Sequence, residues 1–447
     1  RTSALSERVP MHLNRSKIFA SDFVDRPYWW GGTPRPHLTS DGLPPKVDVL
    51  IIGSGYTGLC ASIQTARGGR STLVIDTEDI GWGCSSRNGG QVSSSIKPDF
   101  ARLSKQHGSD TAREVLKEGY RALAWIGDFI REEGIACNFR VTGRFHGAHT
   151  PRHYEKLGRR LNSHPDGPAL SAHLVPRSEQ SSEISTDFYH GGLVFQKHAS
   201  LDPAAYHQGL LERALAAGVH VVGHCPALSI ESLPRGAGYR IRTGGGTVEA
   251  RDVVVATGGY TGPLTPWQQR RVIPIGSYII ATEDLGIEQA SRLIPMDRNI
   301  TDSRRVVVYY RLSPDRRRLL FGGRVSLTET DTRVSAPRLH DQMTVIFPQL
   351  KDARVTHSWM GFVGWTFAHV PHLGQYNGVW YSLGYCGSGI SLASYFGTRL
   401  GQQVLGLKEG RTALDDLPFR TRPFYHGKPW FLSASVWWYG QLDRIGI

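Results

Sequence analysis

One stretch, VDVLIIGSGYTG (residues 47–58), decides the fold. Residues 47–52 are an apolar run, which is typical of a parallel strand that is buried on both faces. A glycine turn follows, and residues 59–67 have the composition of a helix. A second apolar run, residues 71–75, leads into Asp76. This order of strand, turn, helix and strand predicts a βαβ unit of about 30 residues and therefore an α/β fold.

The glycines of the turn have the spacing of a dinucleotide-binding site. Gly53 permits the tight turn, Gly55 lets the backbone approach a pyrophosphate, and Gly58 lets the helix pack closely on the strand. The N-terminus of the helix offers free N–H groups to the phosphates, and Asp76 is placed to bind ribose hydroxyls. A glycine-rich turn without a ligand is the alternative, but the complete βαβ context favours dinucleotide binding. The predicted cofactor-binding residues of this unit are Gly53, Gly55, Tyr56, Thr57, Gly58, Asp76 and Thr77.

The segment after the second strand favours FAD over NAD. Residues 81–91 concentrate glycines, amides and hydroxyls in eleven positions, which suits a loop that runs along a ribityl chain and a pyrimidine ring. The predicted cofactor-binding residues of this loop are Ser85, Ser86, Arg87, Asn88, Gly89, Gly90 and Gln91.

These motifs resemble the D-amino-acid oxidase and glycine oxidase superfamily of FAD-dependent amine oxidoreductases, especially its gamma-glutamylputrescine oxidoreductase branch. In that branch a GxGASGRNGGQ-like stretch follows the ribose acid, as residues 81–91 do here. Residues 252–259 resemble the second strand-to-ATG motif of the superfamily, and residues 384–389 resemble its C-terminal flavin loop. The resemblance covers most of the chain from about Tyr28 onward. It implies further cofactor contacts at Ala227, Thr257, Gly258, Gly387, Ser388, Gly389 and Ile390.

The chain departs from the family pattern in both flavin loops. Cys84 and Ser86 stand where relatives usually have Ala and Gly, and Ser388 stands where they commonly have His. Several relatives attach FAD through Cys or His, and Cys84 and Cys386 fall in these loops. Neither matches a family attachment position, so we expect FAD to bind without a covalent link.

Three residues are candidates for the substrate site. Arg311 lies in a predicted hairpin (residues 306–324) whose counterpart in relatives covers the flavin, so it is the candidate for binding a substrate carboxylate. Strand alternation leaves open a solvent-facing or structural Arg311. In the aromatic stretch 364–374, Trp365 is expected to wall the amine site and His369 to act on a proton, with a core position as the alternative for both.

The composition excludes several other classes of protein. The 447 residues carry a formal net charge of +13, but the basic clusters are short and scattered, so no nucleic acid is expected as a partner. The five cysteines form no CxxC pair, which predicts neither a metal site nor a disulfide framework. No apolar run of about 18 residues occurs, so we expect a cytoplasmic protein and no membrane association. The aromatic residues of 429–442 are expected to cover the protein's own surface instead of a membrane.

The sequence therefore predicts a two-domain α/β flavoprotein, with a Rossmann-like FAD-binding domain and a sheet-rich α+β substrate domain. The predicted function is oxidation of a C–N bond of an amine or amino acid, by hydride transfer to flavin N5 and hydrolysis of the imine. Oxygen and a quinone both remain open as the electron acceptor. A flavin-dependent RNA-modifying enzyme and a non-catalytic flavin-binding subunit are the alternatives. The predicted parts are a leader (1–45), an FAD-binding domain (46–100, 200–262 and 370–410), a substrate domain (101–199 and 263–369) and a C-terminal aromatic segment (411–447).

Overall fold

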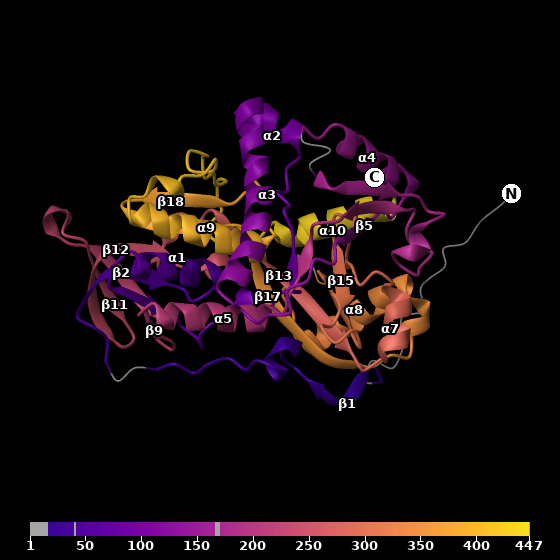
Figure 1. Cartoon of the computed structure of the whole chain (residues 1–447), viewed down its shortest axis with the longest axis horizontal. Coiled ribbons are helices and arrows are strands. Elements are labelled where there is room, and N and C mark those ends of the chain that lie inside the picture. The colour runs from indigo at the N-terminus through magenta and orange to yellow at the C-terminus, as the bar shows by residue number, and fades with distance from the viewer. Residues whose placement is uncertain (1–16, 40–41, 166–169, 325, 327, 447) are drawn as a thin grey trace.

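The computed structural model describes residues 17–39, 42–165, 170–324, 326 and 328–446. Two large sheets lie side by side along the long axis of the molecule, and α3 (Ser109–Glu132) stands between them in the view of Figure 1. One sheet has eight strands and the other has nine.

The eight-stranded sheet contains the predicted βαβ unit. Its parallel core runs in the order β9-β3-β2-β12-β19. The side chains of β2 alternate between two clusters of buried residues, Val49 and Ile51 in one and Leu50 and Ile52 in the other, so the strand is buried on both faces. Helices α1, α5 and α9 pack together against this sheet. The bounds are β2 (Lys46–Ile52), α1 (Tyr56–Arg67), β3 (Thr72–Ile75), α5 (Pro203–Ala216), β9 (His220–Val222), β12 (Gly246–Val255), β18 (His372–Tyr376), β19 (Val379–Leu383) and α9 (Gly389–Val404).

An antiparallel hairpin extends the same sheet. β10 (Ala227–Ser232) and β11 (Tyr239–Thr243) pair with each other, and β11 pairs with β12. β12 is one continuous strand. Its first half pairs with the hairpin while its other edge already pairs with β2, so the strand runs without a turn.

The nine-stranded sheet has the order β1-β17-β13-β16-β15-β14-β5-β7-β6. β1 comes from the predicted leader and pairs in parallel with β17, so the leader is part of this sheet. The sequence did not predict β17 as one long strand. The bounds are β1 (Phe19–Val24), β5 (Arg144–Gly147), β6 (Ala172–Val175), β7 (Gly192–Phe195), β13 (Val272–Thr282), β14 (Asn299–Asp302), β15 (Val308–Leu312), β16 (Leu319–Gly323) and β17 (Val355–Thr366).

Two consecutive helices cover residues 100–132. α2 (Phe100–His107) ends at Gly108, whose φ of +85° lies in the left-handed region that glycine adopts at low cost, and α3 begins immediately afterwards. The remaining elements are the strand pair β4 (Gln91–Val92) and β8 (Ala199–Ser200) and the helices α4 (Pro151–Asn162), α6 (Pro266–Gln269), α7 (Ile287–Leu293), α8 (Thr332–Ile346) and α10 (Leu432–Arg444).

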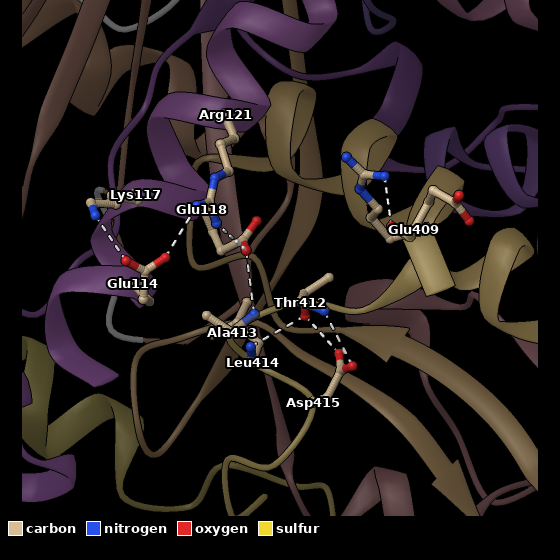
Figure 2. Close-up of polar contacts among 10 residues, drawn as sticks. Glu114, Lys117, Glu118, Arg121, Glu409, Thr412, Ala413, Leu414 and Asp415 are labelled. Atoms are coloured by element: carbon tan, nitrogen blue, oxygen red, sulfur yellow. Dashed lines mark hydrogen bonds and ion pairs between the residues drawn. The ribbon is translucent and has the colours of Figure 1, made fainter. Parts of the chain in front are cut away.

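A cluster of charged side chains on α3, Glu114, Lys117, Glu118 and Arg121, holds the chain that follows α9 (Figure 2). Arg121 donates to both Glu118 (3.0 Å) and Glu114 (3.1 Å), and Lys117 donates to Glu114 (2.8 Å). The buried Glu118 carboxylate also accepts from the backbone N–H of Ala413 (3.3 Å). This α3 charge cluster therefore neutralises its own charges and attaches residues 408–415 to the body.

All strands of the eight-stranded sheet fall within the three stretches that the sequence assigns to the FAD-binding domain. The exact division into domains stays a proposal. Within the described part of the chain, no helix is both long and apolar enough to cross a membrane.

Candidate functional site

A cavity of about 990 Å³ lies between the two sheets. On one side it is lined by the residues that directly follow β2, β3 and β12, where the carboxyl ends of parallel strands meet. On the other side it is lined by residues of β13, β15 and β17 in the nine-stranded sheet. Ligands of open α/β sheets bind outside the carboxyl ends of the strands, so this is the candidate active site.

The glycine turn is shaped by contacts that leave no room for side chains. A Cβ on Gly53, whose φ is +107°, would lie 2.7 Å from the carbonyl oxygen of Ala256. A Cβ on Gly58 would lie 1.9 Å from the carbonyl oxygen of Gly53. Gly58 does not line the cavity; its absent side chain lets α1 approach β2, as the motif predicted.

The wall beside Gly55 is a polar cradle. A Cβ on Gly55 would lie 2.9 Å from the Ser85 hydroxyl oxygen, which accepts the backbone N–H of Tyr56 at 3.0 Å. The N-terminus of α1 and the 81–91 loop thus meet at this point. The cradle fits a pyrophosphate, which needs close backbone approach and N–H donors.

Asp76 is oriented by its neighbours at the end of β3. Its Oδ2 accepts from the backbone N–H (2.8 Å) and the hydroxyl (2.6 Å) of Ser54. The carboxylate lines the cavity, which fits the acid that binds ribose hydroxyls in FAD.

The 81–91 loop divides into lining and supporting residues. Ser86 is fully buried and donates to the carbonyl of Gly81 at 2.6 Å, while Gly90 sits where a Cβ would lie 2.3 Å from the carbonyl oxygen of Leu201. Neither lines the cavity, so the prediction that they contact the cofactor is not supported. The predicted residues that do line it are Gly53, Gly55, Tyr56, Thr57, Asp76, Thr77, Ser85, Arg87, Asn88, Gly89, Gln91, Ala227, Thr257, Gly258, Gly387, Ser388, Gly389 and Ile390.

Three tryptophan side chains donate hydrogen bonds to the 81–91 loop, and the sequence did not predict these contacts. Trp29 and Trp359 donate from Nε1 to the carbonyls of Asn88 (2.9 Å) and Arg87 (2.7 Å). Trp30 donates to the Ser86 hydroxyl at 3.0 Å. The leader and β17 therefore both fix the conformation of the loop.

Arg311 does not line the cavity, and its predicted role is corrected. Its guanidinium is buried and donates to the carbonyls of Gly90 (2.9 Å), Leu201 (2.8 Å) and Leu312 (3.0 Å). The carbonyls accept from Nε and Nη1, while Nη2 is buried without an acceptor. Because the side chain does not line the cavity, it is not placed to bind a substrate carboxylate. Arg311 is a structural residue that joins β15 to the flavin loop.

Trp365 and His369 do line the cavity, at the end of β17 and in the turn that follows it. Their rings meet edge to face with centroids 5.6 Å apart. Burial lowers the pKa of His369, with Arg102 and Lys97 acting in the same direction, so its imidazole is neutral at pH 7. Tyr309, which the sequence did not single out, lines the same region, and its hydroxyl lies 2.7 Å from that of Ser277.

One face of α10 closes part of the cavity. Leu432, Ser435, Val436 and Tyr439 line it, and their spacing puts them on one side of the helix. Asp443 of α10 accepts the backbone N–H groups of residues 305 and 306 at 2.8 and 3.0 Å. The C-terminal aromatic segment thus covers the protein's own site as expected, although the outward-facing Trp437 and Trp438 remain more than half exposed.

The two cysteines of the flavin loops are protonated thiols at neutral pH. Burial raises the pKa of Cys84 and that of Cys386 to about 11. Cys386 donates to the carbonyl of Gly384 and does not line the cavity, whereas Cys84 does.

One group of side chains near the ribose acid has metal-binding residue types. His37 and His224 approach the same Asp79 oxygen at 2.9 and 2.7 Å. Hydrogen bonds from both imidazoles hold the pKa of Asp79 below its usual range. The three side chains are solvent-accessible and tie the leader to the loop after β3; the absence of a metal site stays a prediction.

Comparisons with known proteins agree with this geometry. A family model described as FAD dependent oxidoreductase matches residues 48–403. The chain is 33% identical over 408 residues to the probable oxidoreductase OrdL of Rhizobium meliloti (strain 1021), which covers 90% of this chain and 93% of that protein. It is 28% identical over 414 residues to the gamma-glutamylputrescine oxidoreductase of Escherichia coli (strain K12), with 90% and 93% covered. The fold is similar to that of glycine oxidase from Geobacillus kaustophilus, with a TM-score of 0.71, 18% identity, and 85% of this chain and 99% of that chain covered.

Proposed function

The chain belongs to the family of FAD-dependent oxidoreductases, and from this premise we propose that it oxidises the C–N bond of an amine or amino acid. One observation carries the proposal: a single cavity joins the dinucleotide turn at Gly53 to a chamber lined by Tyr309, Trp365 and His369. A cofactor and a small substrate can therefore meet in it. The names of the similar proteins, gamma-glutamylputrescine oxidoreductase and glycine oxidase, point to the same substrate classes.

The protein's part in this reaction is binding and orientation. The Gly53–Gly58 turn would hold the pyrophosphate, Asp76 the ribose and the backbone at Ala227 the adenine. The loops 81–91 and 384–390 would hold the flavin. Bound FAD supplies the hydride acceptor, at its N5 atom.

The chamber residues would prepare the amine. Trp365 gives it a flat apolar wall, and α10 excludes bulk water from that side. The neutral His369 can accept a proton from an ammonium substrate, although an amine that binds deprotonated needs no side-chain base. Once a hydride has left the carbon next to nitrogen, water hydrolyses the imine to a carbonyl compound and an amine.

Anaerobic flavin bleaching against a panel of amines and amino acids tests the proposed function. We expect at least one compound of these classes to reduce the flavin with saturation kinetics. If dithionite bleaches the flavin and no amine or amino acid does, the proposal is wrong and a binding role or another substrate class replaces it. Repeating the successful reaction with oxygen and with a soluble quinone identifies the electron acceptor.

We also propose that FAD is held without a covalent bond. Both loop thiols are protonated at neutral pH, which disfavours nucleophilic attachment. Acid precipitation should release all yellow colour to the supernatant; colour in the pellet would contradict this and direct attention to Cys84, which lines the cavity.

A further inference from the structure

The chamber end of the cavity is strongly cationic. Among the described lining residues the only carboxylates are Asp76 and Glu78, at the end where the ribose would bind. No aspartate or glutamate of the described chain lines the other end. The cationic lining residues outside the ribose end are Arg87, Lys97, Arg102, Arg144, Arg305, Arg324 and Arg422.

Several of these cations already have interaction partners within the protein. Arg324 forms an ion pair with Glu329 at 2.9 Å. Arg87 lies between the rings of Trp30 and Trp82, at 4.5 and 4.1 Å, and donates to the carbonyl of Trp82 at 2.6 Å. Their presence in the wall therefore needs no ligand to explain it.

Arg144 and Lys97 have no such partners among the described residues. Arg144 lies on β5 over the ring of Phe195 (4.6 Å), and its Nε is buried without a hydrogen-bond acceptor. The ammonium of Lys97 lies 6.0 Å above the Trp365 ring and beside Gly387 of the C-terminal flavin loop, again with no acceptor. The accessible surface of Lys97 faces the cavity.

The surroundings of both side chains disfavour their charges. Burial, with the nearby Arg144 acting in the same direction, lowers the pKa of Lys97 to about 8. Burial also lowers the pKa of Arg144 to about 10, with Arg160 of α4 adding to the effect. The neighbouring His146 stays neutral, because burial and the charges of Arg144, Arg160 and Lys97 hold its pKa well below the usual value.

A cleft lined by charges of one sign attracts counter-ions, so these two cavity-lining cations would be stabilised by an anion between them. A guanidinium and an ammonium together suit a carboxylate, since the first can bind it with two parallel hydrogen bonds and the second adds a point charge. The turn that would bind the phosphates of FAD follows β2 of the eight-stranded sheet, whereas Arg144 lies on β5 of the nine-stranded sheet.

We propose that Lys97 and Arg144 form an anion subsite that binds a substrate carboxylate, so that this enzyme selects carboxylate-bearing amines and excludes polyamines. The inference rests on the proposed function and names its substrate class. The subsite replaces Arg311, which does not line the cavity, as the charge that recognises the substrate.

Ligand titration of the oxidised holoenzyme tests the subsite without turnover. The probes are butyrate, glutarate and putrescine, and the signal is the change in flavin absorbance. We expect the two carboxylates to bind and putrescine not to bind. Lys97→Met and Arg144→Met should each weaken carboxylate binding by about ten- to hundredfold, because each removes a charge-assisted contact. Lys97→Arg should retain most of the affinity.

Lys117→Met is the matched control, because Lys117 is a lysine of the α3 charge cluster whose partner is Glu114. It should leave carboxylate affinity unchanged. Flavin content and circular dichroism must match the parent protein for each variant; if Lys97→Met does not fold, Lys97→Gln and the Arg144 variant provide the same readout.

Unchanged carboxylate affinity in folded Lys97 and Arg144 variants would overturn the subsite. So would a shift of the flavin reduction potential in Lys97→Met without a loss of affinity, because the lysine would then act on the cofactor. A protein that binds carboxylates through this pair but is bleached by no amine would instead keep the subsite and reject the proposed function.

Discussion

The α3 charge cluster and the Lys97–Arg144 pair differ in whether their basic side chains have carboxylate partners. On α3, Arg121 and Lys117 each lie within 3.1 Å of a carboxylate, and the buried Glu118 has a basic partner. In the chamber, neither Lys97 nor Arg144 has a carboxylate partner among the described residues, although burial raises the cost of both charges. The charges on α3 are neutralised within the fold, whereas the charges of Lys97 and Arg144 are available to the anion that we propose they bind.

Arg311 is instructive because it is intermediate between the two. It is buried without an ion pair, and three carbonyl oxygens accept from its Nε and Nη1 while its Nη2 has no acceptor. Arg144 is only partly buried and also has a nitrogen without an acceptor. The two arginines differ in placement, because Arg144 lines the cavity and Arg311 does not.

The largest effect is expected from loss of FAD, because the chamber can act on a substrate only when the cofactor is bound. We expect Gly58→Ala to lose most of its flavin and about 3 kcal/mol of stability, since the new Cβ would meet the Gly53 carbonyl at 1.9 Å. The flavin-to-protein absorbance ratio of purified protein measures this.

Gly127→Ala is the control for that change, because Gly127 is also helical and its nearest neighbour is a ring atom of Phe139 at 3.5 Å. It should retain flavin and gain up to about 1 kcal/mol from helix propensity. Equal flavin contents in the two variants would mean that the turn does not hold the cofactor.

Replacing Arg121 of the α3 charge cluster and replacing Arg144 of the chamber should change the free energy of unfolding in opposite directions. Arg121→Met leaves the Glu118 carboxylate buried without its ion pair, so we expect a loss of about 2 kcal/mol in the free energy of unfolding. Arg144→Met removes a partly buried charge that has no carboxylate partner among the described residues, so it should be neutral or stabilising by about 1 kcal/mol. Urea unfolding of the holoenzyme without substrate measures both, and a destabilised Arg144→Met variant would show that Arg144 maintains the fold.

The affinity for carboxylates should decrease as the pH rises through about 8. Lys97 carries its charge below its pKa of about 8 and loses it above, while Arg144 keeps its charge to about pH 10. The thiol of Cys386, with a pKa of about 11, and the neutral His369 and His146 do not titrate in this window. Butyrate titrations from pH 6.5 to about 9.5 should show a decrease of up to about tenfold per pH unit above the pKa. The decrease should be absent in Lys97→Arg, and a flat profile in the parent protein would exclude Lys97.

The smallest effect is expected at His369. Its neutral imidazole can accept the proton of an ammonium substrate, but solution also supplies the free amine, so His369→Gln should slow bleaching by less than about tenfold. The loss should occur only at a pH below the pKa of the substrate amine. Rapid-mixing measurements on both sides of that pKa check this, and an equal loss on both sides would give His369 a packing role.

Local patterns were sufficient to predict the cofactor half of the molecule. The βαβ unit, the α/β fold and the FAD-dependent family are confirmed, because the Gly53–Gly58 spacing and Asp76 each serve a local geometric need. The C-terminal flavin loop, which the sequence identified by its resemblance to the family motif, lies between β19 and α9.

The substrate-binding half could not be predicted in the same way, because its arrangement depends on contacts between segments that are distant in the sequence. Alternation along β15 cannot reveal that carbonyls of Gly90 and Leu201 lie beside Arg311. Lys97 is a single lysine after a run of serines, and Arg144 begins a four-residue strand, so nothing in the sequence links them. The parallel pairing of β1 with β17 joins segments more than three hundred residues apart, which no periodicity encodes.

The wide sequence span of the cavity wall, from Ile52 to Tyr439, has a consequence for how the protein is made. At about 5–20 residues per second, a ribosome would release the glycine turn roughly 20–80 seconds before the helix that completes the wall. During that interval β2 lacks its later neighbour β12 and α1 lacks α9, so apolar strand and helix faces stay uncovered. Because the cavity wall includes Tyr439, we expect flavin to bind only after that residue has been synthesised.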